Sequence, residues 1–144
     1  MSAPALDCVV DASVGAMLFL LEPLSPNAHK LFEGLAASPP RRLFVPDLFY
    51  VECANVLLKH VRRGGYSVRE ARRDLADLRS LALTAVPTYK LVDGALSIAE
   101  AEGITAYDGC YVALADELEV PLITADMKLV RRLAGTAHQV RALD

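Results

Sequence analysis

Short apolar runs alternate with helical patterns along nearly all of the 144-residue sequence. The first run, residues 6–10, is apolar and β-branched apart from Asp7, and it ends at Asp11. Such a run is typical of a short buried strand. Because parallel strands need long crossover connections, the alternation predicts an α/β fold with a parallel sheet and helices on both faces.

Cap and turn residues set the expected bounds of these elements. Ser25 and Asp47 are suited to cap helices, Ser67 and Glu70 have the spacing of a capping box, and the glycine pair at 64–65 can end a helix. The expected strands span residues 6–10, 43–45, 83–86, 120–124 and 139–143. The expected helices run to residue 21 after the first strand, then over 27–36, 47–63, 67–81, 91–102, 108–119 and 127–133.

Length and composition favour one globular domain, residues 1–144. A hydrophobic share of 53% with 23% charged residues excludes a disordered chain. The most apolar uninterrupted run, residues 14–21, is far shorter than the roughly 20 residues of a membrane span. No basic residue precedes Lys30, unlike in a secretory signal, so a cytoplasmic location is expected. The three cysteines lack metal-site spacing and are expected to be buried thiols.

The charges are unevenly distributed along the chain, although the net charge is only −3. Residues 59–79 hold seven basic residues and three acids, whereas residues 93–126 hold eight acids and no Lys or Arg. This pattern indicates either a basic face for a polyanion or ordinary solvated helix faces. In the first case, the candidate nucleic-acid-binding residues are Arg62, Arg63, Arg72 and Arg73.

Two aspartates directly follow expected buried strands. Asp11 follows the first strand, and Asp126 follows the strand that ends at Thr124. In open parallel sheets, ligands bind at the carboxyl ends of the strands. An Asp in this position also caps helices, so a structural and a functional interpretation are both open.

A further carboxylate lies in an otherwise apolar helix. Residues 48–58 are apolar at nine of eleven positions, and the exceptions are Glu52 and Asn55. A desolvated carboxylate costs several kcal/mol unless a cation or hydrogen-bond donors compensate it. Glu52 therefore indicates either a buried salt bridge or a metal or catalytic site. Asp108, expected in the first turn of its helix, fits the helix dipole and equally a role in such a site.

The acids Asp11, Glu52, Asp108 and Asp126 would repel one another if they converged at one end of the sheet, unless a divalent cation is bound. Carboxylate oxygens without a nearby histidine favour Mg²⁺ or Mn²⁺ over Zn²⁺. Such ions activate water and neutralise charge on a phosphodiester. The hydroxyls of Ser13 and Thr124 are expected to support the acids or to form local turns, and Asn55 is a candidate for orienting Glu52.

Four local patterns together resemble the PIN domain family, and within it the VapC-type ribonuclease toxins. They are Val-Val-Asp-Ala-Ser at 9–13, Glu-x-x-Asn-Val at 52–56, Tyr-Asp-Gly-Cys-Tyr-Val-Ala-Leu-Ala at 107–115 and Leu-Ile-Thr-Ala-Asp at 122–126. Each pattern is common alone. Their order and spacing across nearly the whole chain make the combination specific.

The resemblance implies a three-layer α/β/α sandwich and cleavage of single-stranded RNA at an acidic Mg²⁺ or Mn²⁺ site. It also implies a homodimer and a partner antitoxin. Carried over by position, the acids are Asp11, Glu52, Asp108 and Asp126, the supporting hydroxyls Ser13 and Thr124, and the neighbouring polar residue Asn55. Gly109, which directly follows Asp108, is a poor helix former and is expected to weaken the first turn of that helix.

Two other interpretations remain open. Related acidic sites cut DNA, so a structure-specific DNA nuclease is one alternative. The other is a non-catalytic module whose acids bind a cation or a basic peptide. A receiver-like phospho-acceptor domain fits less well, because the paired acids at the first strand and a lysine after the last main strand are not convincingly placed.

Overall fold

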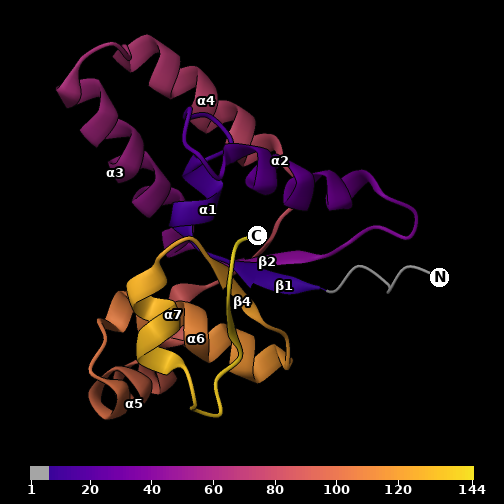
Figure 1. Cartoon of the computed structure of the whole chain (residues 1–144), viewed down its shortest axis with the longest axis vertical. Helices are drawn as coiled ribbons and strands as arrows, with labels where there is room; N and C mark the ends of the chain where they lie inside the picture. The colour runs from indigo at the N-terminus through magenta and orange to yellow at the C-terminus, as the bar shows by residue number, and fades with distance from the viewer. Residues whose placement is uncertain (1–6) are drawn as a thin grey trace.

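A five-stranded parallel sheet forms the centre of the computed structural model, which describes residues 7–144 (Figure 1). Its order is β3-β2-β1-β4-β5, and every pairing of neighbours is parallel. The strands are β1 (Cys8–Val10), β2 (Leu43–Pro46), β3 (Thr84–Val86), β4 (Leu122–Thr124) and β5 (Val140–Ala142). The predicted parallel sheet is therefore confirmed, while Leu6 of the first expected strand lies outside the described residues.

Helices cover the sheet in two layers, as Figure 1 shows. One layer contains α1 (Ala12–Ala16), α2 (Ser25–Glu33), α3 (Leu48–Arg63) and α4 (Val68–Ser80). The other contains α5 (Val92–Glu102), α6 (Ala106–Leu118) and α7 (Met127–Leu133). Short 3₁₀ turns, η1 (Gly34–Ala36) and η2 (Thr88–Lys90), follow α2 and β3. The arrangement confirms the three-layer α/β/α fold.

The core lies on both faces of the sheet, with α6 packed on one face and α1 and α3 on the other. Val9 and Val10 of β1 are fully buried, and α6 places Tyr111 and Leu114 in the same cluster. Burying a side chain of this size contributes roughly 1.5–3 kcal/mol. Gly109 allows the close crossing of α6 with α5, because a Cβ there would stand 2.5 Å from the carbonyl oxygen of Ala95. The glycine that weakens the helix is thus needed for packing.

The hairpin of α3 and α4 carries the clearest cap signals. Gly64 ends α3 with a φ of 95°, which favours glycine. The Ser67 hydroxyl accepts from the Glu70 amide and the Glu70 carboxylate accepts from the Ser67 amide, both at 3.0 Å. The predicted capping box is confirmed. Figure 1 shows the joined ends of the two helices projecting away from the sheet.

Three local predictions were wrong. The first helix ends at Ala16 and not at residue 21, because the amides that follow bond to carbonyls three residues back and tighten the chain into turns. Ser25 does not cap α2, since its hydroxyl donates to the Leu20 carbonyl and accepts from the Glu22 amide. Asp47 caps no helix with its side chain and instead accepts two hydrogen bonds from Thr88.

No helix within residues 7–144 is long and apolar enough to cross a membrane.

Candidate active site

The ends of β1 and β4 bring the first acid and its neighbours together. The two strands pair with Val10 beside Ile123, so the residues that follow them leave the same edge of the sheet. Asp11 comes directly after β1, and Thr124 is the last residue of β4. Their hydroxyl–carboxylate contact therefore follows from the strand register.

Asp11 is buried, and both of its carboxylate oxygens accept hydrogen bonds. Oδ1 accepts from the hydroxyl and amide of Ser13 and from the amide of Val14, and Oδ2 accepts from the hydroxyl of Thr124. Burial raises the pKa of Asp11 to about 6, and the hydrogen bonds from Ser13 and Thr124 only partly oppose it. Asp11 thus caps α1 and also carries an unneutralised charge at the strand end.

The loop after β4 is tied to the same group. The Ser13 hydroxyl accepts from the Ala125 amide at 3.0 Å, and the Thr124 hydroxyl accepts from the Asp126 amide at 3.0 Å. Asp126 caps α7, but its own carboxylate is exposed and makes both cap bonds through Oδ1. The helix-cap interpretation is correct for Asp11 and Asp126, and it leaves Oδ2 of Asp126 available to a ligand.

Asp108 exchanges charge effects with each of the other acids. The cap of α6 is the Thr105 hydroxyl, which accepts from the Asp108 amide, so capping does not account for the carboxylate of Asp108. Burial raises the pKa of Asp108, and the charge of Asp126 raises it further. The charge of Asp108 in turn contributes to the raised pKa values of Asp11 and Glu52. The four acids that the sequence predicts are therefore electrostatically connected through Asp108.

Glu52 is held by a tyrosine and not by a basic residue. The buried Tyr111 hydroxyl donates to Glu52 Oε1 at 2.6 Å. Burial raises the pKa of Glu52 in spite of this hydrogen bond. Within residues 7–144, no ion pair involves Glu52, so the salt-bridge interpretation is wrong. Tyr111 is a functional residue that its apolar sequence surroundings concealed, although its place three residues after Asp108 puts both on one face of α6.

The donor set suits a hard cation, although its members are not yet gathered around one point. The site offers carboxylate and hydroxyl oxygens, the ligands that Mg²⁺ and Mn²⁺ prefer. None of its four acids forms an ion pair in the described part of the chain. Across residues 7–144, no three acidic, histidine or cysteine side chains form a ready-made metal cluster.

The remaining predicted residues lie outside this group. Asn55 is exposed one turn along α3 from Glu52, whose hydrogen-bond partner is Tyr111. The arginines of the basic stretch are exposed on the α3–α4 hairpin. Arg62 follows Glu52 by ten residues, about 15 Å along the helix axis. These arginines are Arg62, Arg63, Arg72 and Arg73.

A pocket of about 580 Å³ opens at the acids. Its lining includes two basic side chains that the sequence motifs did not indicate. Asp108 and Asp126 line it together with Lys128 and Arg132 of α7. The sequence signal that could have indicated Lys128 and Arg132 is their position, two and six residues after Asp126.

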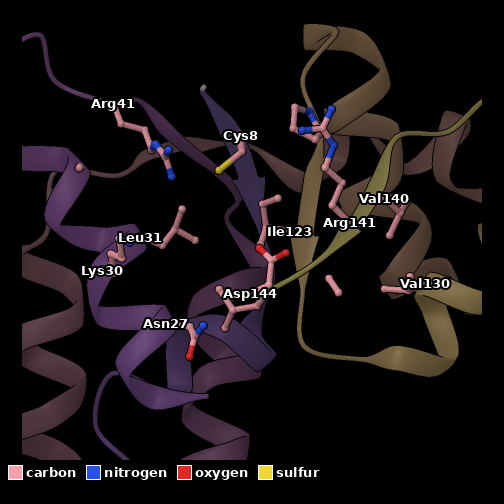
Figure 2. Close-up of a pocket in the computed structure, with 14 residues that line it drawn as sticks. Cys8, Asn27, Lys30, Leu31, Arg41, Ile123, Val130, Val140, Arg141 and Asp144 are labelled. Carbon is pink, nitrogen blue, oxygen red and sulfur yellow. The ribbon is translucent and has the colours of Figure 1, made fainter. Parts of the chain in front are cut away.

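A larger cleft, of about 890 Å³, lies elsewhere, and Figure 2 shows its lining. It runs between α2, which contributes Leu31, and the strand residues Cys8, Ile123 and Arg141. None of the four clustered acids lines this cleft, so size alone does not mark the candidate active site.

Comparisons with known proteins identify the family of the chain. A family model described as PIN domain matches residues 8–135. Ribonuclease VapC3 of Pyrobaculum aerophilum is 36% identical over 126 residues, which cover 86% of this chain and 92% of that protein. Ribonuclease VapC9 of Mycobacterium tuberculosis is 38% identical over 121 residues, covering 84% and 87% respectively.

Solved structures show the same fold. The crystal structure of PAE2754 from Pyrobaculum aerophilum has a TM-score of 0.69 at 24% identity and covers 99% of this chain and 93% of that one. VapBC2 from Rickettsia felis, bound to a DNA fragment from its promoter, gives a TM-score of 0.66 at 13% identity, covering 96% and 99%. A toxin–antitoxin complex from Klebsiella pneumoniae gives 0.61 at 15% identity, covering 94% and 96%.

Proposed function

The chain belongs to the PIN domain family, and from this membership we propose that it is a metal-dependent endoribonuclease that cuts single-stranded RNA as the toxin of a toxin–antitoxin pair. The observation that carries the proposal is that the charges of four acids, none of which forms an ion pair within residues 7–144, act on one another near the carboxyl ends of β1 and β4. The relatives named as ribonucleases support the reaction class. These acids are Asp11, Glu52, Asp108 and Asp126.

In this proposal Asp11, Glu52, Asp108 and Asp126 would hold Mg²⁺ or Mn²⁺. A bound ion would lower the pKa of water and neutralise charge on the phosphodiester. The protein's own part is to fix the donors: Ser13 and Thr124 hold both oxygens of Asp11 in place. Tyr111 fixes Oε1 of Glu52, so that this carboxylate can orient the attacking water.

The test is cleavage of labelled single-stranded RNA by the purified chain with Mg²⁺ or Mn²⁺. We expect cutting that EDTA abolishes and that Asp108→Asn reduces by at least about a hundredfold, while Asp77→Asn, which neutralises an exposed acid on α4, cuts normally. Single-stranded and flap DNA serve as comparison substrates. Preferential cutting of DNA would replace this proposal with the DNA-nuclease alternative, and cation binding without any cutting would favour the interaction module.

We further propose an antitoxin protein as partner, since two of the similar structures are described as toxin–antitoxin or VapBC assemblies. A homodimer and a cytoplasmic location stay predictions from the resemblance and the sequence. Co-expression of the chain with the small protein encoded beside it, followed by size-exclusion chromatography with light scattering, measures both the complex and the number of copies in it.

A further inference from the structure

The pocket beside the acids is lined by side chains of both charges. Asp108 and Asp126 line it together with Lys128 and Arg132. Lys128 and Arg132 are four residues apart on α7 and therefore lie on one face of the helix. A group that enters this pocket meets carboxylates and basic side chains side by side.

The basic side chains of Arg132 and Lys128 differ in how they are held. Arg132 is anchored, because its Nε donates to the Glu102 carbonyl at 2.8 Å and a terminal nitrogen reaches the Gly103 carbonyl at 3.5 Å. Gly103 has a φ of 69°, a left-handed conformation that favours glycine, and it ends α5 where Arg132 reaches its carbonyl. Lys128 is exposed and forms no ion pair within residues 7–144. Its charge is therefore available to an anion.

We propose that this pocket is a phosphate subsite in which Lys128 binds a backbone phosphate next to the cleaved bond. The inference rests on the proposed function and names how that site holds its substrate. The group bound here is a phosphodiester and not a nucleobase, because the pocket offers no aromatic ring on which a base could stack. Besides the charged residues, the lining consists of Gly103, Ile104, Thr105 and Leu129. The anchored Arg132 adds a second, fixed positive charge to the lining of the subsite.

The subsite differs from the basic stretch on the α3–α4 hairpin in where it acts. Arg62 lies about 15 Å along α3 from Glu52 and can reach only RNA that extends beyond the acids. Lys128 lines the same pocket as Asp108 and Asp126. The hairpin arginines are therefore expected to affect binding alone, whereas Lys128 affects how the reacting phosphodiester is placed.

A chemical double-mutant cycle tests the contact between Lys128 and phosphate. An RNA that the wild type cuts is prepared with one neutral methylphosphonate at a 2′-deoxy linkage on either side of the cleaved bond, and the matched control keeps the 2′-deoxy phosphodiester. Wild type and Lys128→Gln are compared on each RNA in single-turnover cleavage. Lys90→Gln, which removes an exposed lysine on η2, is the control for loss of charge.

We expect Lys128→Gln and the neutral linkage at one of the two positions each to slow cleavage about tenfold, and the two together to slow it no more than either alone. Lys128→Arg should restore most of the rate. The inference is overturned if Lys128→Gln cleaves like wild type, or if the two effects multiply at both positions.

A failure of the proposed function is distinguishable from a failure of the subsite. If the wild type cuts no RNA, binding of labelled single-stranded RNA is measured by fluorescence anisotropy over a salt series. Loss of one phosphate contact should lower the slope of log affinity against log salt by about 0.7 in Lys128→Gln and leave it unchanged in Lys90→Gln. Equal slopes in all three proteins overturn the subsite.

Discussion

The acid site has a closed half and an open half. In the closed half, Asp11 is buried and both of its oxygens accept hydrogen bonds. In the open half, Asp126 is exposed and Asp108 is only half-buried. Glu52 is intermediate, because Tyr111 holds one of its oxygens. The difference separates a part of the site that hydrogen bonds fix in place from a part whose carboxylates are more accessible to solvent.

The largest effect on stability is expected from a substitution in the closed half, Asp11→Asn. The pKa of Asp11 is raised to about 6, so the folded chain binds the proton more tightly than the unfolded chain does. The resulting stabilisation is complete below about pH 4 and is lost as pH rises through 6, a loss of about 3 kcal/mol. Asp11→Asn removes this loss. In EDTA, wild-type stability should fall relative to Asp11→Asn by about 1 kcal/mol from pH 5 to pH 8.

Urea unfolding at the two pH values measures this effect. Asp11→Asn should abolish RNA cleavage. At pH 8 in EDTA, the same variant should have a higher free energy of unfolding than the wild type. A parallel pH dependence of the two proteins would contradict the assignment of the raised pKa to Asp11. Added Mg²⁺ should stabilise the wild type and not the variant if Asp11 holds the ion.

A smaller effect comes from removing one hydrogen bond to Asp11. Thr124→Val keeps the shape of a buried side chain but deletes the donor to Oδ2 of Asp11. We expect a loss of about 2 kcal/mol at pH 8, where the carboxylate is ionised, and a smaller loss at pH 5. Thr84→Val on the exposed edge strand β3 is the matched control. Equal losses at both pH values would mean that packing, and not the charged hydrogen bond, explains the effect.

The smallest effect on stability is expected in the open half. Asp126→Asn leaves an equally good cap for α7 and removes a charge that is already exposed. The free energy of unfolding should change by less than about 0.5 kcal/mol, whereas RNA cleavage should be lost. Thermal unfolding in EDTA together with the cleavage assay measures both quantities. If Asp126→Asn lowered the free energy of unfolding as much as Thr124→Val does, the division of the site into a closed and an open half would be wrong.

Several features were predictable because they depend on local chemistry. The Ser67–Glu70 capping box and the glycine that ends α3 formed as expected, since each involves residues close in sequence. The parallel sheet was predictable from the spacing of apolar runs. The bounds of α1 were not, because hydrogen bonds of Ser25 to the chain after α1 compete with continuation of that helix.

The sequence by itself determined which acids are present and that Asp11 and Asp126 follow strands, because strand ends are visible as ends of apolar runs. Only the tertiary structure decided that Tyr111, and not a basic residue, holds Glu52. It also decided that Lys128 stands at the acids while the arginine-rich hairpin projects away. Apolar periodicity records which residues are buried, whereas partners across elements depend on how helices are placed against the sheet, and this placement leaves no local pattern.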